Sequence, residues 1–322
     1  MTSEPLNQYT DICKDAIKGS SAKLGKTFEN LLLEILLLYI VIQRKINFTQ
    51  MERYGTHCEQ TYRMNFNRGR AKCINWVKFN LALSRHYLNM DGLLAIAIDP
   101  SYISKSGKKT PHIGTFWSGC ASSMKHGLEI MGLALVDVYA NNCMMLRAHQ
   151  TPSTSDLKLR SMTLVQHYIA VIKRYRKDLL KVSDIIVADA FFSIRLFVDG
   201  IKEHGFNLVS RFRDTANLHY VYMGPRSKKR GRPKTLDGKI NYKKLDLTRM
   251  VEMHVDGLEG NAYTLIAYSK ALKQKVRLVI WMMPNGRHKL FFSTKTSMSG
   301  EDVLRTYRSR FQIEFCFRDA KQ

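Results

Sequence analysis

Two runs of continuous apolar residues, each followed by an aspartate, constrain the fold of this chain most strongly. Residues 93–98 (LLAIAI) precede Asp99, and residues 185–188 (IIVA) precede Asp189. Such runs are typical of strands buried on both faces. Residues 153–181 between them predict a long helix, and this crossover lets the two strands lie parallel and adjacent. Both aspartates should then emerge side by side at one rim of a sheet, where functional sites are built.

Three further aspartates compete for such a role. Asp184 precedes its strand and is expected at the opposite rim, and Asp199 falls within the helix predicted over 193–204. Asp137 ends the run LEIMGLALVDV on a neighbouring strand and is the best alternative. Because two more strands follow the first, residues 93–138 should form a meander, with FNLVSRF as a fifth strand.

A basic turn and a tryptophan lie within this predicted meander. The segment SYISKSGKKTP carries three lysines around a glycine and is expected to be a hairpin turn that touches a phosphate backbone: Lys105, Lys108 and Lys109. Trp117, on the next predicted strand, is expected to pack into the core, and a base-stacking platform is the alternative.

The C-terminal stretch YRSRFQIEFCFRDAK carries four regularly spaced polar residues: Tyr307, Arg310, Glu314 and Lys321. At about 100° per residue all four lie on one face of a helix. Ser299 and Asp302 predict its start, and Leu304, Phe311 and Phe315 form an adjacent apolar stripe. A carboxylate flanked by cations and a phenol is a combination used in metal-dependent phosphoryl chemistry. A solvated helix with ordinary ion pairs would show the same pattern.

The spacing Y-x2-R-x3-E-x6-K resembles the signature of bacterial insertion-sequence transposases, which are DDE enzymes with a ribonuclease H-like core. The resemblance covers roughly residues 93–322. It implies that Asp99, Asp189 and Glu314 are the catalytic residues and hold two Mg²⁺ or Mn²⁺ ions.

The same resemblance implies further DNA contacts by this helix. Tyr307, Arg310 and Lys321 would hold phosphates near the transposon end, around a flipped base. Relatives place a tryptophan ahead of the helix to stack on that base. Leu290 stands near that position here, and Trp281 lies nine residues earlier.

The charge of the chain indicates a polyanionic partner. The 322 residues contain 51 Lys and Arg against 27 Asp and Glu, a formal net charge of +24 that is spread along the sequence. Double-stranded DNA is therefore the expected partner, at both transposon ends and target sites. The apolar run over residues 31–42 contains Glu34 and is too short to span a bilayer, so we expect a core helix and no membrane contact.

The six cysteines show no CxxC spacing, which indicates reduced cytosolic thiols and excludes a zinc site or a disulfide framework. The resemblance then implies a bacterial cytoplasmic protein associated with the nucleoid.

Residues 1–90 are expected to be an all-α domain that binds the DNA end. Thr49 with Glu52 and Thr56 with Glu59 predict the starts of two short helices around Gly55, as in a helix-turn-helix. The second helix would present Arg63 to DNA.

Residues 214–295 break the α/β order with alternating, β-like runs. The resembling transposases carry a β-rich insertion at this place. SKKRGRPK within it resembles the core of minor-groove hooks, and its cations are candidate DNA contacts: Arg230, Arg232 and Lys234. A solvated basic loop is the alternative interpretation.

The fold class predicted is therefore α/β. A ribonuclease H-like core (91–213 and 296–322), interrupted by the β-rich insertion (214–295), follows the helical domain (1–90). The expected function is that of a transposase that binds terminal inverted repeats and catalyses metal-dependent cleavage and strand transfer as a homodimer in a synaptic complex.

Two other classes of protein remain as alternatives: a non-catalytic DNA-binding regulator, and a ribonuclease H-like nuclease without strand transfer. Because the sequence stops one residue after Lys321, we also expect a truncated copy with weak end pairing and cleavage.

Overall fold

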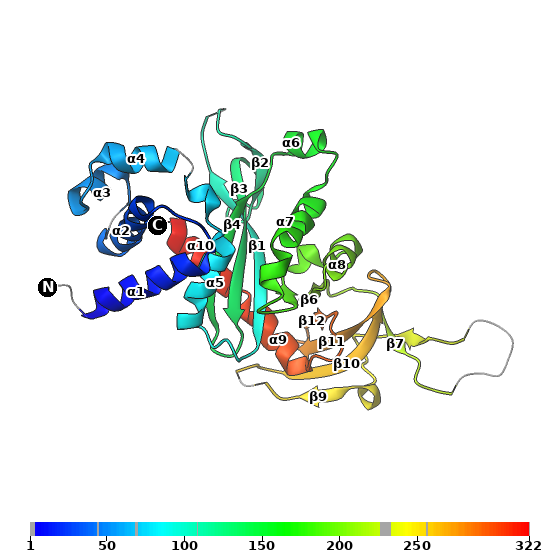
Figure 1. Ribbon diagram of the computed structural model, residues 1–322. Helices are drawn as coiled ribbons and strands as arrows, with labels where there is room; N and C mark the ends of the chain where they lie inside the picture. Colours follow the sequence, from blue (N-terminus) through cyan, green and yellow to red (C-terminus); the bar gives the residue numbers. More distant parts are fainter. Residues whose placement is uncertain are drawn as a thin grey trace.

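The computed structural model describes residues 4–43, 45–67, 70–107, 109–225, 233–255 and 257–321. A helical N-terminal region leads into a large mixed sheet with helices on both faces (Figure 1). None of the helices in these ranges is long and apolar enough to cross a membrane.

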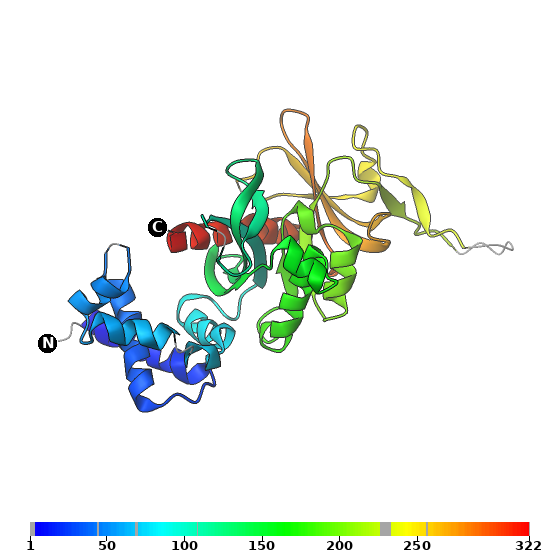
Figure 2. The ribbon, with the colours of Figure 1, turned by 90° about the horizontal axis from the view of Figure 1, so that it is seen from above.

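The N-terminal helices enclose a hydrophobic core of their own, to which α2 contributes Leu31, Leu32 and Ile35. The α5 helix contacts both α1 and β4, and so joins this region to the sheet (Figure 2). The helices are α1 (Glu4–Gly19), α2 (Lys26–Val41), α3 (Phe48–Tyr54), α4 (Glu59–Asn67) and α5 (Trp76–Tyr87), with a 3₁₀ turn η1 (Arg70–Cys73).

Glu34, an acid on α2, fixes the turn between α3 and α4. Glu34 accepts hydrogen bonds from the backbone N–H of Thr56 at 2.6 Å and the hydroxyl of Tyr62 at 2.6 Å, and its carboxylate lies 2.7 Å from His57 Nδ1. Thr56 therefore serves this network and does not cap α4. The start predicted for α3 at Thr49 is also wrong, because Asn47 is the N-cap.

One sheet contains all the strands of the described chain, in the order β2-β3-β1-β5-β6-β12-β11-β10-β7-β8, with β4 on β3 and β9 on β10. The β1–β5 and β5–β6 pairs are parallel, and the other pairs are antiparallel. The strands are β1 (Leu94–Ser104), β2 (Gly114–Ser118), β3 (Ser123–Asp137), β4 (Asn142–Gln150), β5 (Ile185–Val187), β6 (Asn207–Phe212), β7 (Leu218–Val221), β8 (Leu236–Lys239), β9 (Val251–Met253), β10 (Asn261–Ser269), β11 (Gln274–Met282) and β12 (His288–Ser293).

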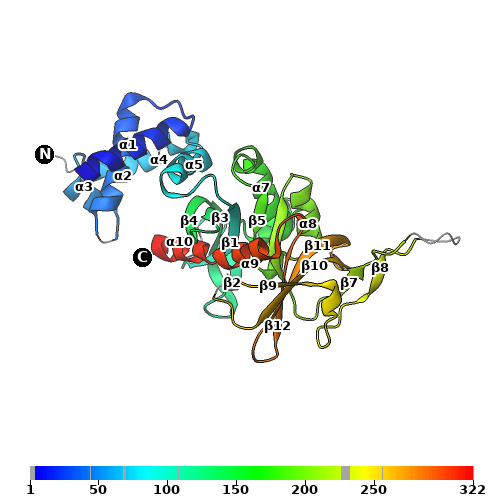
Figure 3. The same cartoon turned by 90° about the horizontal axis from the view of Figure 1, so that it is seen from below.

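Helices cover both faces of the sheet over two separate apolar cores. The helices on one face are α6 (Thr154–Leu159), α7 (Leu164–Leu179) and α8 (Arg195–Lys202). On the other face α9 (Gly300–Ser309) and α10 (Gln312–Lys321) follow one another across the strands (Figure 3). Two further 3₁₀ turns are η2 (Ala190–Phe192) and η3 (Leu247–Arg249).

The prediction that β1 stops at Asp99 is wrong. The parallel pairing with β5 ends at Ala97, but β1 continues to Ser104 because β3 pairs with it over its whole length. Since β3 lies between β1 and β2, residues 93–138 are not a meander. The lysine-rich segment after Ser104 therefore joins two strands that are not neighbours and is not a hairpin turn.

Two predicted helices are each divided in two. Residues 153–181 form α6 and α7, and each begins with its own capping box, at Ser153 and at Thr163. The C-terminal helix starts as expected, with Ser299 accepting from the backbone N–H of Asp302 at 3.0 Å, but it breaks after Ser309.

The break in the C-terminal helix lets its halves pack on different strands. The α9 helix contacts β6, β10, β11 and β12, whereas α10 contacts β1, β3 and β4. Because the break interrupts the helical periodicity, Ile313 and Phe317 are buried, whereas Phe311 is 49% exposed. Phe311 therefore does not belong to the predicted apolar stripe. Where α10 crosses β4, Cys316 Sγ lies 3.8 Å from Cys143 Sγ. No cysteine of the described chain forms a disulfide.

A glycine on β3 permits the close approach of α10. A Cβ atom on Gly132 would lie 2.5 Å from Phe317 Cζ and 3.2 Å from Ile313 Cδ1. We predict that Gly132→Ala loosens α10, lowers the free energy of unfolding by about 1–3 kcal/mol and accelerates amide hydrogen exchange over residues 312–321. Gly119→Ala is the matched control, because its Cβ would meet open space. Equal exchange in both variants would contradict this account of the packing.

Candidate active site

The parallel pairing of β1 and β5 brings two aspartates to one edge of the sheet. Ile96 pairs with Ile186 and Ala97 with Val187, so Asp99 and Asp189 each lie two residues beyond the last pair. The Asp189 carboxylate also accepts a hydrogen bond from the backbone N–H of Phe191 at 3.0 Å, which fixes its direction.

Glu314 reaches this edge from the first turn of α10, and Arg310 lies between the acids. Arg310 Nη1 is 3.5 Å from Asp99 Oδ1, and Nη2 is 3.4 Å from Glu314 Oε1. The Arg310 side chain is only 13% exposed and follows the end of α9 directly, so the helix break places it. The structure thus joins the first and third predicted catalytic acids through one guanidinium.

Burial and neighbouring charges shift the pKa values of both aspartates. Burial raises the pKa of Asp99 to about 7; Arg310 opposes this shift, while the charges of Asp189, Glu314 and Glu129 add to it. Burial also raises the pKa of Asp189, again opposed by Arg310. Carboxylates in this setting favour an additional cation or a proton.

The donor chemistry of the site fits a divalent metal ion. Asp99, Asp189 and Glu314 offer only carboxylate oxygens, the ligands that Mg²⁺ and Mn²⁺ prefer. As they stand, no three His, Cys, Asp or Glu side chains of the described ranges form a group that could hold an ion. Arg310 bridges Asp99 and Glu314 and supplies positive charge there.

The comparison with protein families identifies the family of the chain. The family model described as "Transposase DDE domain" matches residues 151–322, more than half of the chain. The chain belongs to this transposase family. The match includes Asp189 and Glu314 and begins after Asp99. No curated protein matches the chain.

The alternative aspartates of the transposase lie away from this edge. Asp137 pairs with Leu94 at the far end of β1, is buried, and accepts from the backbone N–H groups of Asn89 and Ala140, each at 3.0 Å. These bonds give it a structural role, so it is no longer the best alternative ligand.

The other two competing acids also lie where the sequence placed them. Asp184 forms an ion pair with Lys295 at 2.9 Å before β5 begins, and Asp199 pairs with Arg195 at 3.0 Å on α8. Neither carboxylate reaches the edge that carries Asp99 and Asp189.

A cavity of about 460 Å³ adjoins the acids and is lined by both Tyr307 and Arg310. Trp281 also lines it, although the sequence suggested no tryptophan here. The β11–β12 hairpin pairs Trp281 with Lys289, whose Nζ lies 5.2 Å from the centre of the indole ring. Because of this pairing, Trp281 lies beside position 290 although it is nine residues earlier in the sequence. Leu290 itself is fully buried. Trp281 lies opposite Lys289, next to position 290, so a search of the partner strand for aromatic residues would have found it.

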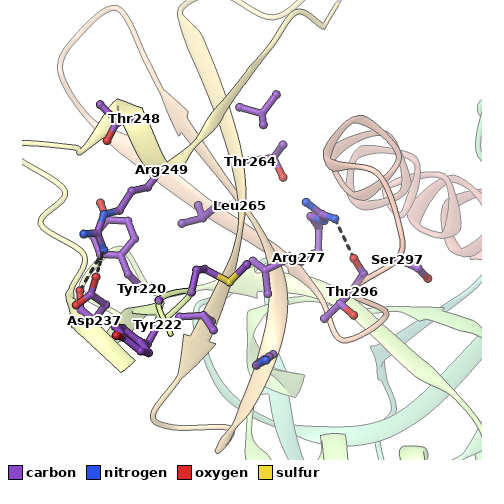
Figure 4. Close-up of a pocket in the computed structure, with 16 residues that line it drawn as sticks. Tyr220, Tyr222, Asp237, Thr248, Arg249, Thr264, Leu265, Arg277, Thr296 and Ser297 are labelled. Carbon is purple, nitrogen blue, oxygen red and sulfur yellow. Dashed lines mark hydrogen bonds and ion pairs between the residues drawn. The ribbon is translucent and has the colours of Figure 1, made fainter. Parts of the chain in front are cut away.

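A larger cavity, of about 1000 Å³, lies among β7, β8 and β10 and contains none of the catalytic acids (Figure 4). On one side, Arg249 pairs with Asp237 at 2.7 Å; on another, Arg277 donates to the Thr296 carbonyl at 3.0 Å. The larger of these two cavities is therefore not the one beside the predicted catalytic acids.

The predicted DNA-binding cations are spread over the molecule. Lys105 and Lys109 are exposed between β1 and β2. Arg63 is engaged on α4, where it pairs with Glu59 and stacks on the Phe48 ring at 5.0 Å.

Of the remaining predicted DNA-binding cations, the structure describes some and not others. Lys234 pairs with Asp237 at 2.6 Å and lies 4.7 Å from the Tyr222 ring centre. Its charge therefore already interacts with a carboxylate and an aromatic ring of the chain. Lys321 is the last residue of α10. Three predicted contacts lie outside the described residues: Lys108, Arg230 and Arg232.

Removing the Arg310 guanidinium should leave buried carboxylates without their counter-charge. We predict that Arg310→Gln lowers the free energy of unfolding by about 3 kcal/mol, measured by urea titration without divalent ions. Adding Asp99→Asn to the same chain should recover most of the loss, because a neutral amide needs no counter-charge. Arg308→Gln, which removes an exposed cation, is the control. A double variant no more stable than Arg310→Gln alone would contradict the assigned ion pair.

Proposed function

We propose that this transposase binds the terminal inverted repeats of an insertion sequence and catalyses metal-dependent DNA cleavage and strand transfer. The observation that carries the proposal is the meeting of Asp99, Asp189 and Glu314 around Arg310 at one edge of the sheet. The parallel β1, β5 and β6, flanked by antiparallel β3 and β4 and covered by helices, support a ribonuclease H-like core.

In this proposal Asp99, Asp189 and Glu314 would hold two Mg²⁺ or Mn²⁺ ions. When bound, such ions activate the attacking water or 3′-OH and stabilise the leaving oxygen. The protein contributes a buried edge in which the carboxylates are fixed before DNA arrives, by strand pairing for Asp99 and by the Phe191 N–H for Asp189. Arg310 offsets part of the negative charge of Asp99 and Glu314 in the free protein, and would bind a phosphate of the DNA.

The cavity beside the acids suits an unpaired base at the transposon end. Trp281 and Tyr307 provide aromatic surfaces, and Lys289 and Arg310 provide positive charge on the same walls. Aromatic rings stack on bases of any sequence, while cations hold the neighbouring phosphates. Tyr307 is itself supported by the Phe291 ring, with 4.9 Å between the ring centres. We propose that this cavity receives the flipped base and that Lys321 assists on the backbone.

The remaining assignments complete the proposal. The α3–α4 pair of the N-terminal domain (1–90) reads the end sequence through Arg63, which must then exchange its pairing with Glu59 for DNA. The cations of the predicted insertion (214–295), Arg230, Arg232 and Lys234, add general affinity for the backbone. Two chains meet on two DNA ends in a synaptic complex, in the bacterial cytoplasm.

Neutralising each catalytic acid tests the proposed function directly. We predict that Asp99→Asn, Asp189→Asn and Glu314→Gln each reduce Mg²⁺-dependent nicking of a terminal-repeat duplex by at least about 1000-fold. Binding of the same duplex, followed by fluorescence anisotropy, should remain nearly unchanged. Asp184→Asn is the matched control, because that acid pairs with Lys295 at the other rim.

The outcomes separate the alternatives. Near-normal nicking by one of the three variants would remove that residue from the triad. Binding without any nicking by the wild-type chain would favour a DNA-binding regulator. Nicking without joining of the 3′ end to a second duplex would favour a nuclease.

The base cavity makes a separate prediction for Trp281. Trp281→Ala should weaken binding of a duplex with an unpaired 2-aminopurine at the cleavage point by about tenfold, while a fully paired duplex that cannot open binds as before. Trp281→Phe, which keeps an aromatic ring, should recover most of the affinity. Equal affinity of all three proteins for the unpaired base would show that the base lies elsewhere.

A further inference from the structure

We propose that a rigid β arm beside the catalytic edge is a second DNA-binding surface, in which Trp117 and Met124 lie against the base edges and sugars of a duplex. The arm comprises residues 100–107 and 109–131 of the described chain. The inference rests on the proposed function, since it concerns the DNA that enters the site of Asp99.

The arm continues directly from the catalytic edge. Asp99 pairs with Gly132, and from there β1 and β3 pair outward to Ser104 and Gly127. From Gly127 to Ser123, β3 pairs with β2 on its other edge. The arm projects beyond the rest of the sheet (Figure 1). Met124 lies eight residues along β3 from Gly132, or roughly 27 Å in an extended strand. A duplex seated at the acids and lying along the arm would reach it after roughly eight base pairs.

Two large apolar side chains stand exposed together on this arm. Trp117 is 58% exposed and Met124 is 57% exposed, and the two residues are direct partners across β2 and β3, so they share one face. The prediction that Trp117 packs into the core is therefore wrong, because its neighbour Phe116 takes the buried face instead. An exposed apolar pair on a monomer indicates a surface that contacts a partner.

The charge of the arm selects a polyanion as that partner. Residues 100–128 contain no aspartate or glutamate but four lysines. The three of them that the structure describes are exposed, and no described carboxylate pairs with them: Lys105, Lys109 and Lys125. Cations that hold phosphates beside apolar side chains that touch bases are a recurrent means of binding DNA. A protein partner would need a complementary acidic surface, and this chain is itself strongly basic.

The arm is held in shape before any DNA binds. Tyr102 donates to the His126 carbonyl at 2.6 Å, and His126 Nε2 lies 3.2 Å from the Gly107 carbonyl oxygen. Gln150 on β4 donates to the Pro111 carbonyl at 2.8 Å, and His112 lies 2.8 Å from Asp156 on α6. These bonds fasten the lysine-bearing segment to β3, β4 and α6, so binding requires little further ordering of the arm.

Two arm variants and one control test the proposal. The first variant carries Trp117→Ala and Met124→Ser. The second carries Lys105→Gln, Lys109→Gln and Lys125→Gln. The control carries Lys173→Gln and Lys177→Gln, in the C-terminal half of α7. All substituted side chains are exposed. Binding is measured without metal on duplexes that carry the terminal repeat flanking the gene and extend past the cleavage point by about four or about twenty base pairs.

We expect both arm variants to bind the long duplex about tenfold more weakly than the wild-type chain and the short duplex equally well. The lysine variant should also lower the salt dependence of long-duplex binding by about 0.9 per lost phosphate contact. The control should match the wild-type chain on both. An unchanged affinity for the long duplex, or equal losses on both lengths, would overturn the proposal.

Two further results have separate meanings. A change in the sedimentation of the DNA-free arm variants would mark the arm as an interface between copies of the chain, and would overturn the proposal. Failure of the wild-type chain to nick any duplex would refute the proposed function, while the dependence of binding on duplex length would still decide the role of the arm.

Discussion

The burial of Asp99 beside the guanidinium of Arg310 is the constraint on which this edge of the sheet depends. Burial raises the pKa of Asp99 to about 7, and the charges of Asp189, Glu314 and Glu129 add to that shift. Arg310 opposes this by facing both Asp99 and Glu314. Burial of the carboxylates therefore favours the binding of an additional cation at a fixed place in the folded chain. A divalent metal ion would supply that positive charge.

The fold serves this arrangement at several levels. Parallel pairing of β1 with β5 sets two acids at one edge, and Gly132 on β3 lets α10 lie close enough to deliver the third. The interruption between α9 and α10 places Arg310 at the junction of the two helices. An unbroken helix would keep one buried stripe and could not pack on both groups of strands.

The sequence predicted the local elements better than their long-range consequences. Continuous apolar runs identified β1 and β5, and the intervening helical segment predicted their parallel pairing, because these signals lie within the elements themselves. The extension of β1 beyond Asp99 depends on the length of β3, and the helix break depends on which strands lie beneath it. The positions of Trp281 in the cavity and of Trp117 on the surface were missed for the same reason. Tertiary pairing decides which strands are partners and which face of a strand is buried, and the periodicity of one segment does not contain that information.

The central claim is that Asp99, Asp189 and Glu314 act as one cation site, and metal-directed cleavage of the protein itself tests it most directly. Fe²⁺ substituted for Mg²⁺, with ascorbate and peroxide, generates hydroxyl radicals that cut the backbone next to a bound ion. The account predicts fragments from cuts near residues 99, 189 and 314 together, suppressed by excess Mg²⁺. Cuts confined to other parts of the chain, or no cuts that Mg²⁺ suppresses, would contradict it.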